Sequence, residues 1–196
     1  MTNDRILGDR ERALEESYFR KHDAALIEKL RQGAMLDEIS LALRDKLHVD
    51  NPGLLALVRD LGVGADTAPA FLLAPLVEIA WADGSVANDD RASVLRLAED
   101  RGVEKESASY ARLQDWLVER PPDAIFDASI EVIKHGFSVL PPKEREERIN
   151  RLLDACREVA AASGNEVAHL LGLGNGISHD EESILARIAA KLRSQP

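Results

Sequence analysis

Cysteine and aromatic residues are scarce in this chain of 196 residues. The single thiol, Cys156, excludes an intrachain disulfide and a zinc site built from several cysteines. Aromatic residues make up only 4% of the chain, while Ala and Leu are frequent, which is a composition typical of helices. Because 45% of the residues are hydrophobic, the chain has enough apolar material for a packed core, and wholesale disorder is excluded.

The chain also lacks an excess of positive charge and a long apolar run. It carries 25 Lys and Arg against 35 Asp and Glu, so its formal net charge is −10. We therefore expect binding neither to nucleic acid nor to an anionic membrane surface, because both depend on neutralising phosphate charge. The longest stretch without a formal charge, 167–179, is too short and too polar to span a bilayer, and residues 1–12 have no apolar signal-peptide core. The default expectation is a cytoplasmic protein without a membrane span.

The N-terminal residues 4–32 have the pattern of one long amphipathic helix. Its heptad register places Lys21 and Glu28 at core positions, which excludes a sustained coiled coil. Two interpretations remain open for this arm. The helix either packs on its own domain or docks a partner chain, which is a second copy or another protein. The apolar residues available for docking are Leu14, Tyr18, Phe19 and Leu26.

Helical periodicity continues to the C-terminus, and no segment alternates with period two for long enough to form a strand. Pro75 either kinks an apolar helix over 67–82 or lies in the first turn of a helix. The residues from Ser178 to Glu181 form a capping box that opens the last helix. The clearest linker, 62–66, divides an N-terminal helical extension (1–64) from a helical domain (65–196). The remaining predicted helices cover 36–47, 52–61, 89–101, 104–119, the segment between Pro121-Pro122 and Pro141-Pro142, and 143–163.

An internal repeat divides the helical domain into two similar halves. Residues 71–84 align with 151–164 at an offset of 80, and residues 86–98 align with 177–189 at an offset of 91. The change of offset places an eleven-residue insertion within 165–176. Each half is a helix, an acidic turn and a second helix. The fold prediction is therefore an all-α, pseudo-symmetric bundle of two such repeats with an N-terminal helical extension.

The residues around the first turn resemble the TerB-like family of tellurite-resistance proteins. The resemblance lies in Ala80-x-Ala82-Asp83-Gly84-x-Val86-x-x-Asp89-Asp90 between two apolar helices, and with the second copy it covers roughly residues 67–196. It implies a small, acidic, helical interaction module without catalytic activity, associated with tellurite and other chemical stress. Asp90 replaces the Glu that is common in the family, and Ser163 stands at the position of Asp83 in the second copy.

The acidic turn is the candidate site. Asp83, Asp89 and Asp90 offer hard oxygen ligands that suit weak binding of Ca²⁺ or Mg²⁺. An EF-hand is excluded, because Val94 occupies the twelfth loop position when counting starts at Asp83. In the alternative interpretation the turn ends one helix, and the acids at 89 and 90 stabilise the positive end of the next.

No residue pattern points to catalysis. The five His are scattered, so a zinc site is not expected, and Cys156 lies on the apolar face of its helix, which favours a buried structural thiol. The Gly-rich segment 172–176 follows no strand and is not a phosphate loop. The sequence therefore predicts a non-catalytic interaction module without a cofactor. The alternatives are a weak metal-binding or metal-sensing protein that uses the acidic turn and an enzyme with a site under the 165–176 segment.

Overall fold

The described part of the chain is entirely helical in its regular elements. The computed structural model describes residues 21, 23–29, 31, 39, 42–43, 49–162 and 177–194. Every regular element in these residues is an α-helix, which confirms the all-α prediction at that level. The predicted helices at 4–32 and 36–47, and the insertion within 165–176, lie mostly or wholly outside the described residues. The helices are α2 (Pro52–Asp60), α3 (Ala68–Leu72), α4 (Ala74–Ala80), α5 (Asn88–Glu99), α6 (Ala108–Trp116), α7 (Asp123–Ser138), α8 (Pro142–Ala162) and α10 (His179–Arg193).

Local sequence signals explain several helix starts. The side chain of Asn51 accepts hydrogen bonds from the backbone N–H groups of Gly53 and Leu54, and Pro52 occupies the first helical position of α2, where its missing N–H costs nothing. Ser178 opens α10 with the predicted capping box, which the structure confirms. The turn between α4 and α5 contains Gly84, whose φ of 81° would be strained in a residue that has a side chain.

Pro75 divides the apolar segment that the sequence predicts as one helix over 67–82. The segment forms α3 and α4 with Leu73 between them, so Pro75 lies in the first turn of α4. Because proline has no N–H, the carbonyl of Phe71, four residues earlier, loses its helical donor. The hydroxyl of Ser129, fully buried on α7, donates to that carbonyl at 2.7 Å. The carbonyl left without its helical donor at the break is thus hydrogen-bonded by a side chain of a neighbouring helix.

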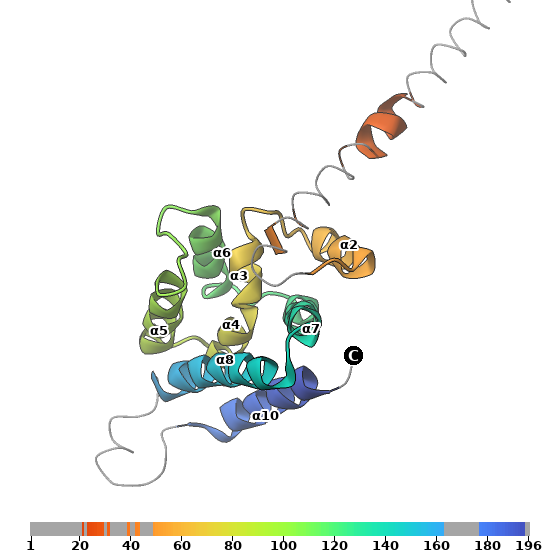
Figure 1. Cartoon of the computed structure of the whole chain (residues 1–196). Coiled ribbons are helices and arrows are strands. Elements are labelled where there is room, and N and C mark those ends of the chain that lie inside the picture. The colour runs from red at the N-terminus through yellow and green to blue at the C-terminus, as the bar shows by residue number, and fades with distance from the viewer. Residues whose placement is uncertain are drawn as a thin grey trace, which may run out of the picture.

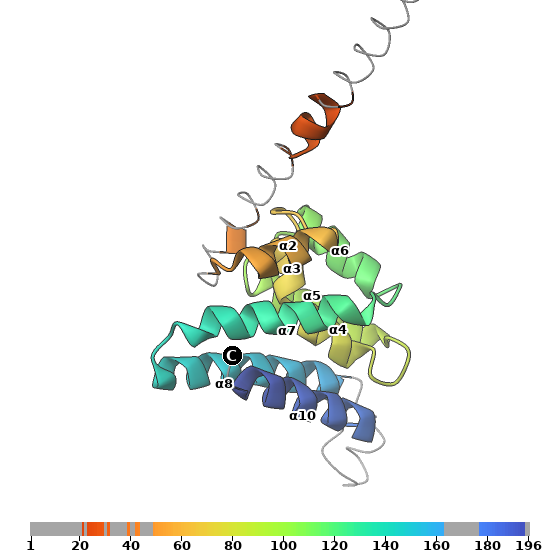
Figure 2. The same cartoon turned by 90° about the vertical axis from the view of Figure 1, so that its right-hand side faces the viewer.

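The core is centred on α4, whose seven residues are all buried. Helices α5, α7, α8 and α10 pack against it, and α3 continues from it to contact α6 and α7 (Figure 1). Figure 2 shows α7, α8 and α10 as three neighbouring rods on one side of the molecule. This arrangement agrees with the nearly all-round apolar composition of the α4 sequence.

The segment before residue 64 shares this core. In α2, which packs on α7, Leu55 and Val58 are buried, and Val63 follows them into the same cluster. Ile39 and Leu43, which the sequence places on one helical face, are helical and fully buried. The division into 1–64 and 65–196 stays a prediction, and the structure adds that apolar side chains from both sides of it pack together.

Candidate functional site

The three carboxylates of the acidic turn lie in different surroundings. Asp83 is exposed in the turn after α4, and its Oδ1 accepts a hydrogen bond from the hydroxyl of Ser178 at 2.9 Å. Asp89 is exposed in the first turn of α5. Asp90 is only 4% exposed, and its Oδ2 accepts the backbone N–H of Ala87 at 3.2 Å. Successive helical residues point about 100° apart, so Asp89 and Asp90 do not converge on Asp83.

Near Asp83 the structure places a further acidic residue, Glu181, which the sequence analysis did not include in the candidate site. Glu181, 3% exposed at the start of α10, accepts the backbone N–H of Ser178 at 2.6 Å. Burial raises the pKa of Glu181, donation from Ser178 opposes the rise, and the charges of Asp83 and Asp90 add to it. Two helix starts, those of α5 and α10, therefore meet at one acidic region linked by Ser178.

This region does not form a recognisable metal centre. Across residues 49–162 and 177–194 and the shorter described pieces before them, no group of three or more His, Cys, Asp or Glu is placed to hold a metal ion. Asp90 instead acts as a helix-capping acceptor, as the helix-start interpretation requires. The metal interpretation of Asp83, Asp89 and Asp90 stays a prediction.

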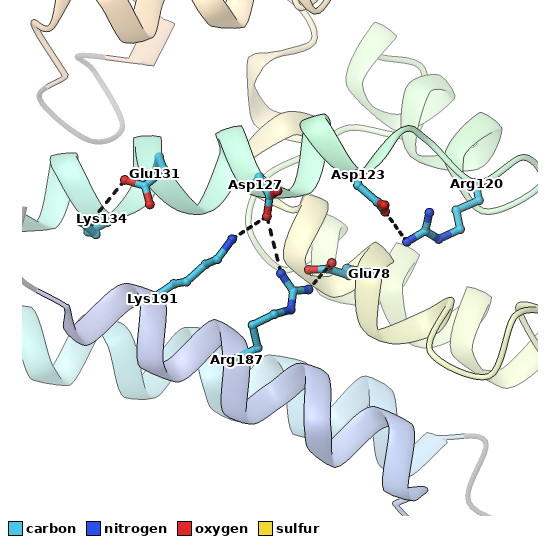
Figure 3. A network of polar contacts seen from close by, with 8 residues as sticks. All are labelled: Glu78, Arg120, Asp123, Asp127, Glu131, Lys134, Arg187 and Lys191. Atoms are coloured by element: carbon cyan, nitrogen blue, oxygen red, sulfur yellow. Dashed lines mark hydrogen bonds and ion pairs between the residues drawn. The ribbon is translucent and has the colours of Figure 1, made fainter.

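A network of charges that the sequence analysis missed crosses the bundle nearby (Figure 3). Glu78, in the buried helix α4, forms an ion pair with Arg187 of α10. Arg187 also lies 3.5 Å from Asp127 of α7, and Lys191 reaches the same carboxylate at 2.6 Å. These contacts join three helices through charges. A sequence signal existed, because Glu78 is the only charged residue within 67–82.

The Glu78 carboxylate is unusual because it is buried. Its side chain is 6% exposed, and Oε1 accepts a hydrogen bond from Arg187, while Oε2 has no hydrogen-bond partner among the described residues. Burial raises the pKa of Glu78, and the charge and hydrogen bond of Arg187 offset only part of that rise. The ionised form of Glu78 is therefore less favourable in the folded protein than in water.

A second Glu–Arg pair connects α8 and α5. Arg96 of α5 forms an ion pair with Glu158 of α8, and its other nitrogen lies 3.1 Å from Asp100. This pair is open to solvent, with the Arg96 and Glu158 side chains 52% and 50% exposed. The chain thus holds the same kind of interhelical pair twice, once with a buried carboxylate beside an Arg187 side chain that is 38% exposed, and once with both members exposed.

Cys156 lies close to the buried pair and is itself inaccessible. Burial, with a smaller contribution from the Glu78 charge, raises the pKa of the thiol to about 12. At neutral pH the group is protonated and has little nucleophilic character. This environment agrees with the predicted structural thiol.

A hollow of about 500 Å³ lies between α8 and α10. Its lining is mostly apolar, with Arg157 and Glu182 as the charged members; the other lining residues are Leu153, Ile177, Leu185, Ala186 and Ala189. The 165–176 segment, under which an enzyme site was considered, lies outside the described residues. None of the lining residues that the structure describes is a His, Cys, Ser or Asp, so these residues offer no nucleophile and base together.

Residues 23–29 form a helical segment that lies apart from the body in both views (Figures 1 and 2). All seven residues are exposed. Leu26 and Ile27 are 50% and 49% exposed, although a Leu or Ile in a folded domain is usually buried. Of the two interpretations of the N-terminal arm, these residues agree with the one in which it stands away from its own domain.

Comparison of the chain with protein-family models, with curated proteins and with solved structures gives no match. Within the described ranges, none of the helices has the length and the apolar run needed to span a bilayer.

Proposed function

We propose that residues 65–196 form a TerB-like bundle of two helix–acidic turn–helix repeats related by a pseudo-two-fold axis. The strongest support comes from the two Glu–Arg pairs. The offset of 80 relates Glu78 to Glu158, and the offset of 91 relates Arg96 to Arg187. Arg187 pairs with Glu78, and Arg96 pairs with Glu158. Each arginine therefore reaches the glutamate of the other repeat, which is the exchange that a two-fold axis produces.

The helix starts support the same relation. The offset of 91 also relates Ala87 to Ser178 and Asp90 to Glu181. In both places the acidic residue is buried and accepts the backbone N–H of the residue three positions before it. The packing of α5 on α8 has its counterpart in the packing of α10 on α4. The proposed repeats thus share helix-capping chemistry as well as helix packing.

The function that follows is that of a non-catalytic interaction module, which docks a protein partner through its N-terminal helical arm. The TerB resemblance supports a role for such a module in a bacterial chemical-stress response of the tellurite type. The observation that carries the proposal is the exposure of Leu26 and Ile27 on a helical segment apart from the body. Large apolar side chains held in water on a helix are what a helix-in-groove contact would bury.

Affinity purification of the tagged full chain from the cells that make it tests this proposal. The variant carries Leu26→Asp and Ile27→Asp, which place two charges in the proposed contact. The matched control carries Val118→Asp and Val139→Asp, at exposed apolar residues of the body. We expect the wild type and the control to retain the same protein and the arm variant to lose it, with all three unfolding at similar temperatures.

Two outcomes would contradict the proposal. Equal retention by the arm variant and the wild type would remove the arm as the docking element. Retention of no protein by the wild type beyond that of a tag-only column, together with a monomeric wild type, would remove the interaction function.

A further inference from the structure

The described arm carries charges as well as exposed apolar side chains. Asp23 and Lys29 flank Leu26 symmetrically, three residues before it and three after it. Neither charge has an ion-pair or hydrogen-bond partner within the described part of the chain. Their side chains are exposed together with those of Leu26 and Ile27. When two such segments pair antiparallel, the apolar centres meet and each negative charge lies opposite the positive charge of the other copy.

The arm also differs from the rest of the chain in its net charge. Residues 4–32 contain seven acidic and seven basic residues, so the arm is neutral and the other residues carry the whole charge of −10. Repulsion therefore opposes contact between two bodies and does not oppose contact between two arms. A neutral arm likewise offers little attraction to nucleic acid or to an anionic bilayer.

We propose that the partner of the arm is a second copy of this chain, bound antiparallel with the two helices crossing at Leu26. In this register Asp23 of each copy lies opposite Lys29 of the other, so the same ion pair forms twice. The two Leu26 side chains meet at the axis, and in this register the Ile27 of each copy lies opposite the small Ala25 of the other. The inference rests on the proposed function, because it names the partner of the arm that the proposal makes the docking element.

Antiparallel pairing follows from the charges. A parallel pair would place Asp23 against Asp23 and Lys29 against Lys29, and it would bring two acidic bodies to the same end of the arms. The antiparallel pair replaces both repulsions by attractions and puts the bodies at opposite ends, where salt screens their charges over about 8 Å. The contact has two-fold symmetry and closes on itself as a dimer.

Sedimentation of the full chain over a range of concentrations tests the register. Asp23→Lys turns both ion pairs into Lys–Lys contacts, and Lys29→Asp turns both into Asp–Asp contacts. We expect each variant to dimerise about ten- to thirtyfold more weakly than the wild type. An equimolar mixture of the two variants restores complementary charges and should recover most of the wild-type affinity as a heterodimer.

The matched controls make the same changes of charge on the body, at exposed residues that have no ion-pair partner in the part of the chain that the structure describes. They are Glu106→Lys and Lys143→Asp, and both should dimerise like the wild type. A monomeric wild type at every concentration would overturn the inference. So would dimers of Asp23→Lys or Lys29→Asp as tight as those of the wild type, or a mixture no tighter than its components.

The two proposals fail separately. If the wild type is monomeric but loses a captured protein when Leu26 and Ile27 become Asp, the arm docks a different partner and only the self-association is wrong. If the wild type dimerises and the charge variants behave as expected, the captured protein is the chain itself.

Discussion

Replacing Arg187 by Met removes the cation from a buried carboxylate while keeping most of the side-chain volume. Glu78 then loses its ion pair, because Arg187 is the only partner that it has within the described ranges. A buried carboxylate in this position either stays ionised at a high desolvation cost or takes up a proton. Protonation is the cheaper route, and it sets the size of the effect.

The reference pKa limits the magnitude. A glutamate of pKa about 4.5 lies roughly 2.5 units below pH 7, so its protonation at pH 7 costs a free energy of about 3.4 kcal/mol. The loss of stability in Arg187→Met should approach that value at pH 7, less the part already incurred in the wild type, whose Glu78 pKa is raised. The loss should shrink by about 1.4 kcal/mol for each pH unit below 7, because protonation becomes easier.

The exposed pair provides a matched control. Arg96→Met breaks the equivalent contact with Glu158, but both side chains are about half exposed, so the stranded carboxylate remains hydrated. We expect a loss of about 0–1 kcal/mol that hardly changes between pH 7 and pH 5. The contrast between the two arginines then isolates burial as the cause.

Urea unfolding of the full chain at pH 7, 6 and 5 measures these free energies. A second variant, Glu78→Gln with Arg187→Met, should recover most of the loss at pH 7, because no buried charge is left to neutralise. Equal losses for Arg187→Met and Arg96→Met, or a loss in Arg187→Met that does not shrink at pH 5, would refute this reasoning.

Three further predictions concern single features. Because the pKa of Glu78 is raised in the folded protein, this residue adds to the free energy of unfolding as the pH falls from that raised pKa towards 4.5. Urea unfolding of Glu78→Gln over the same pH range should therefore show a smaller increase in the free energy of unfolding than the wild type shows. Ser129→Ala strands the buried Phe71 carbonyl and should cost about 1–3 kcal/mol in the same assay, whereas a neutral effect would mean that another donor satisfies it. Millimolar Ca²⁺ should raise the melting temperature no more than matched ionic strength does, and a Ca²⁺-specific rise that Asp83→Asn with Asp90→Asn abolishes would instead establish the metal site.

Signals confined to a few neighbouring residues predicted the structure well. Asn51 followed by Pro52, and Ser178 with Glu181, identify helix starts because capping depends only on residues within one turn. The break at Pro75 was one of two alternatives, and the missing N–H decided where the helix divides.

Pairings between distant residues were not predicted. The partner of Glu78 is 109 residues away, and burial, which makes that pair important, is a property of the assembled bundle. The sequence offsets of 80 and 91 relate the two glutamates and the two arginines, but they do not say which arginine lies beside which glutamate. Likewise, three nearby aspartates suggested one site, while the helical rotation turns Asp90 inward and leaves Asp89 in water.

The unequal burial of the two Glu–Arg pairs restricts the order in which substitutions can accumulate. At the exposed pair, Arg96 or Glu158 can change first, because water accommodates whichever charge is left. At the pair with the buried carboxylate, Glu78 must change before Arg187, because Arg187 retains Asp127 while Glu78 has no second ion pair among the residues that the structure describes. The two contacts that the proposed repeat relates should therefore diverge under different rules, and the one with the buried carboxylate should keep its arginine for as long as it keeps its glutamate.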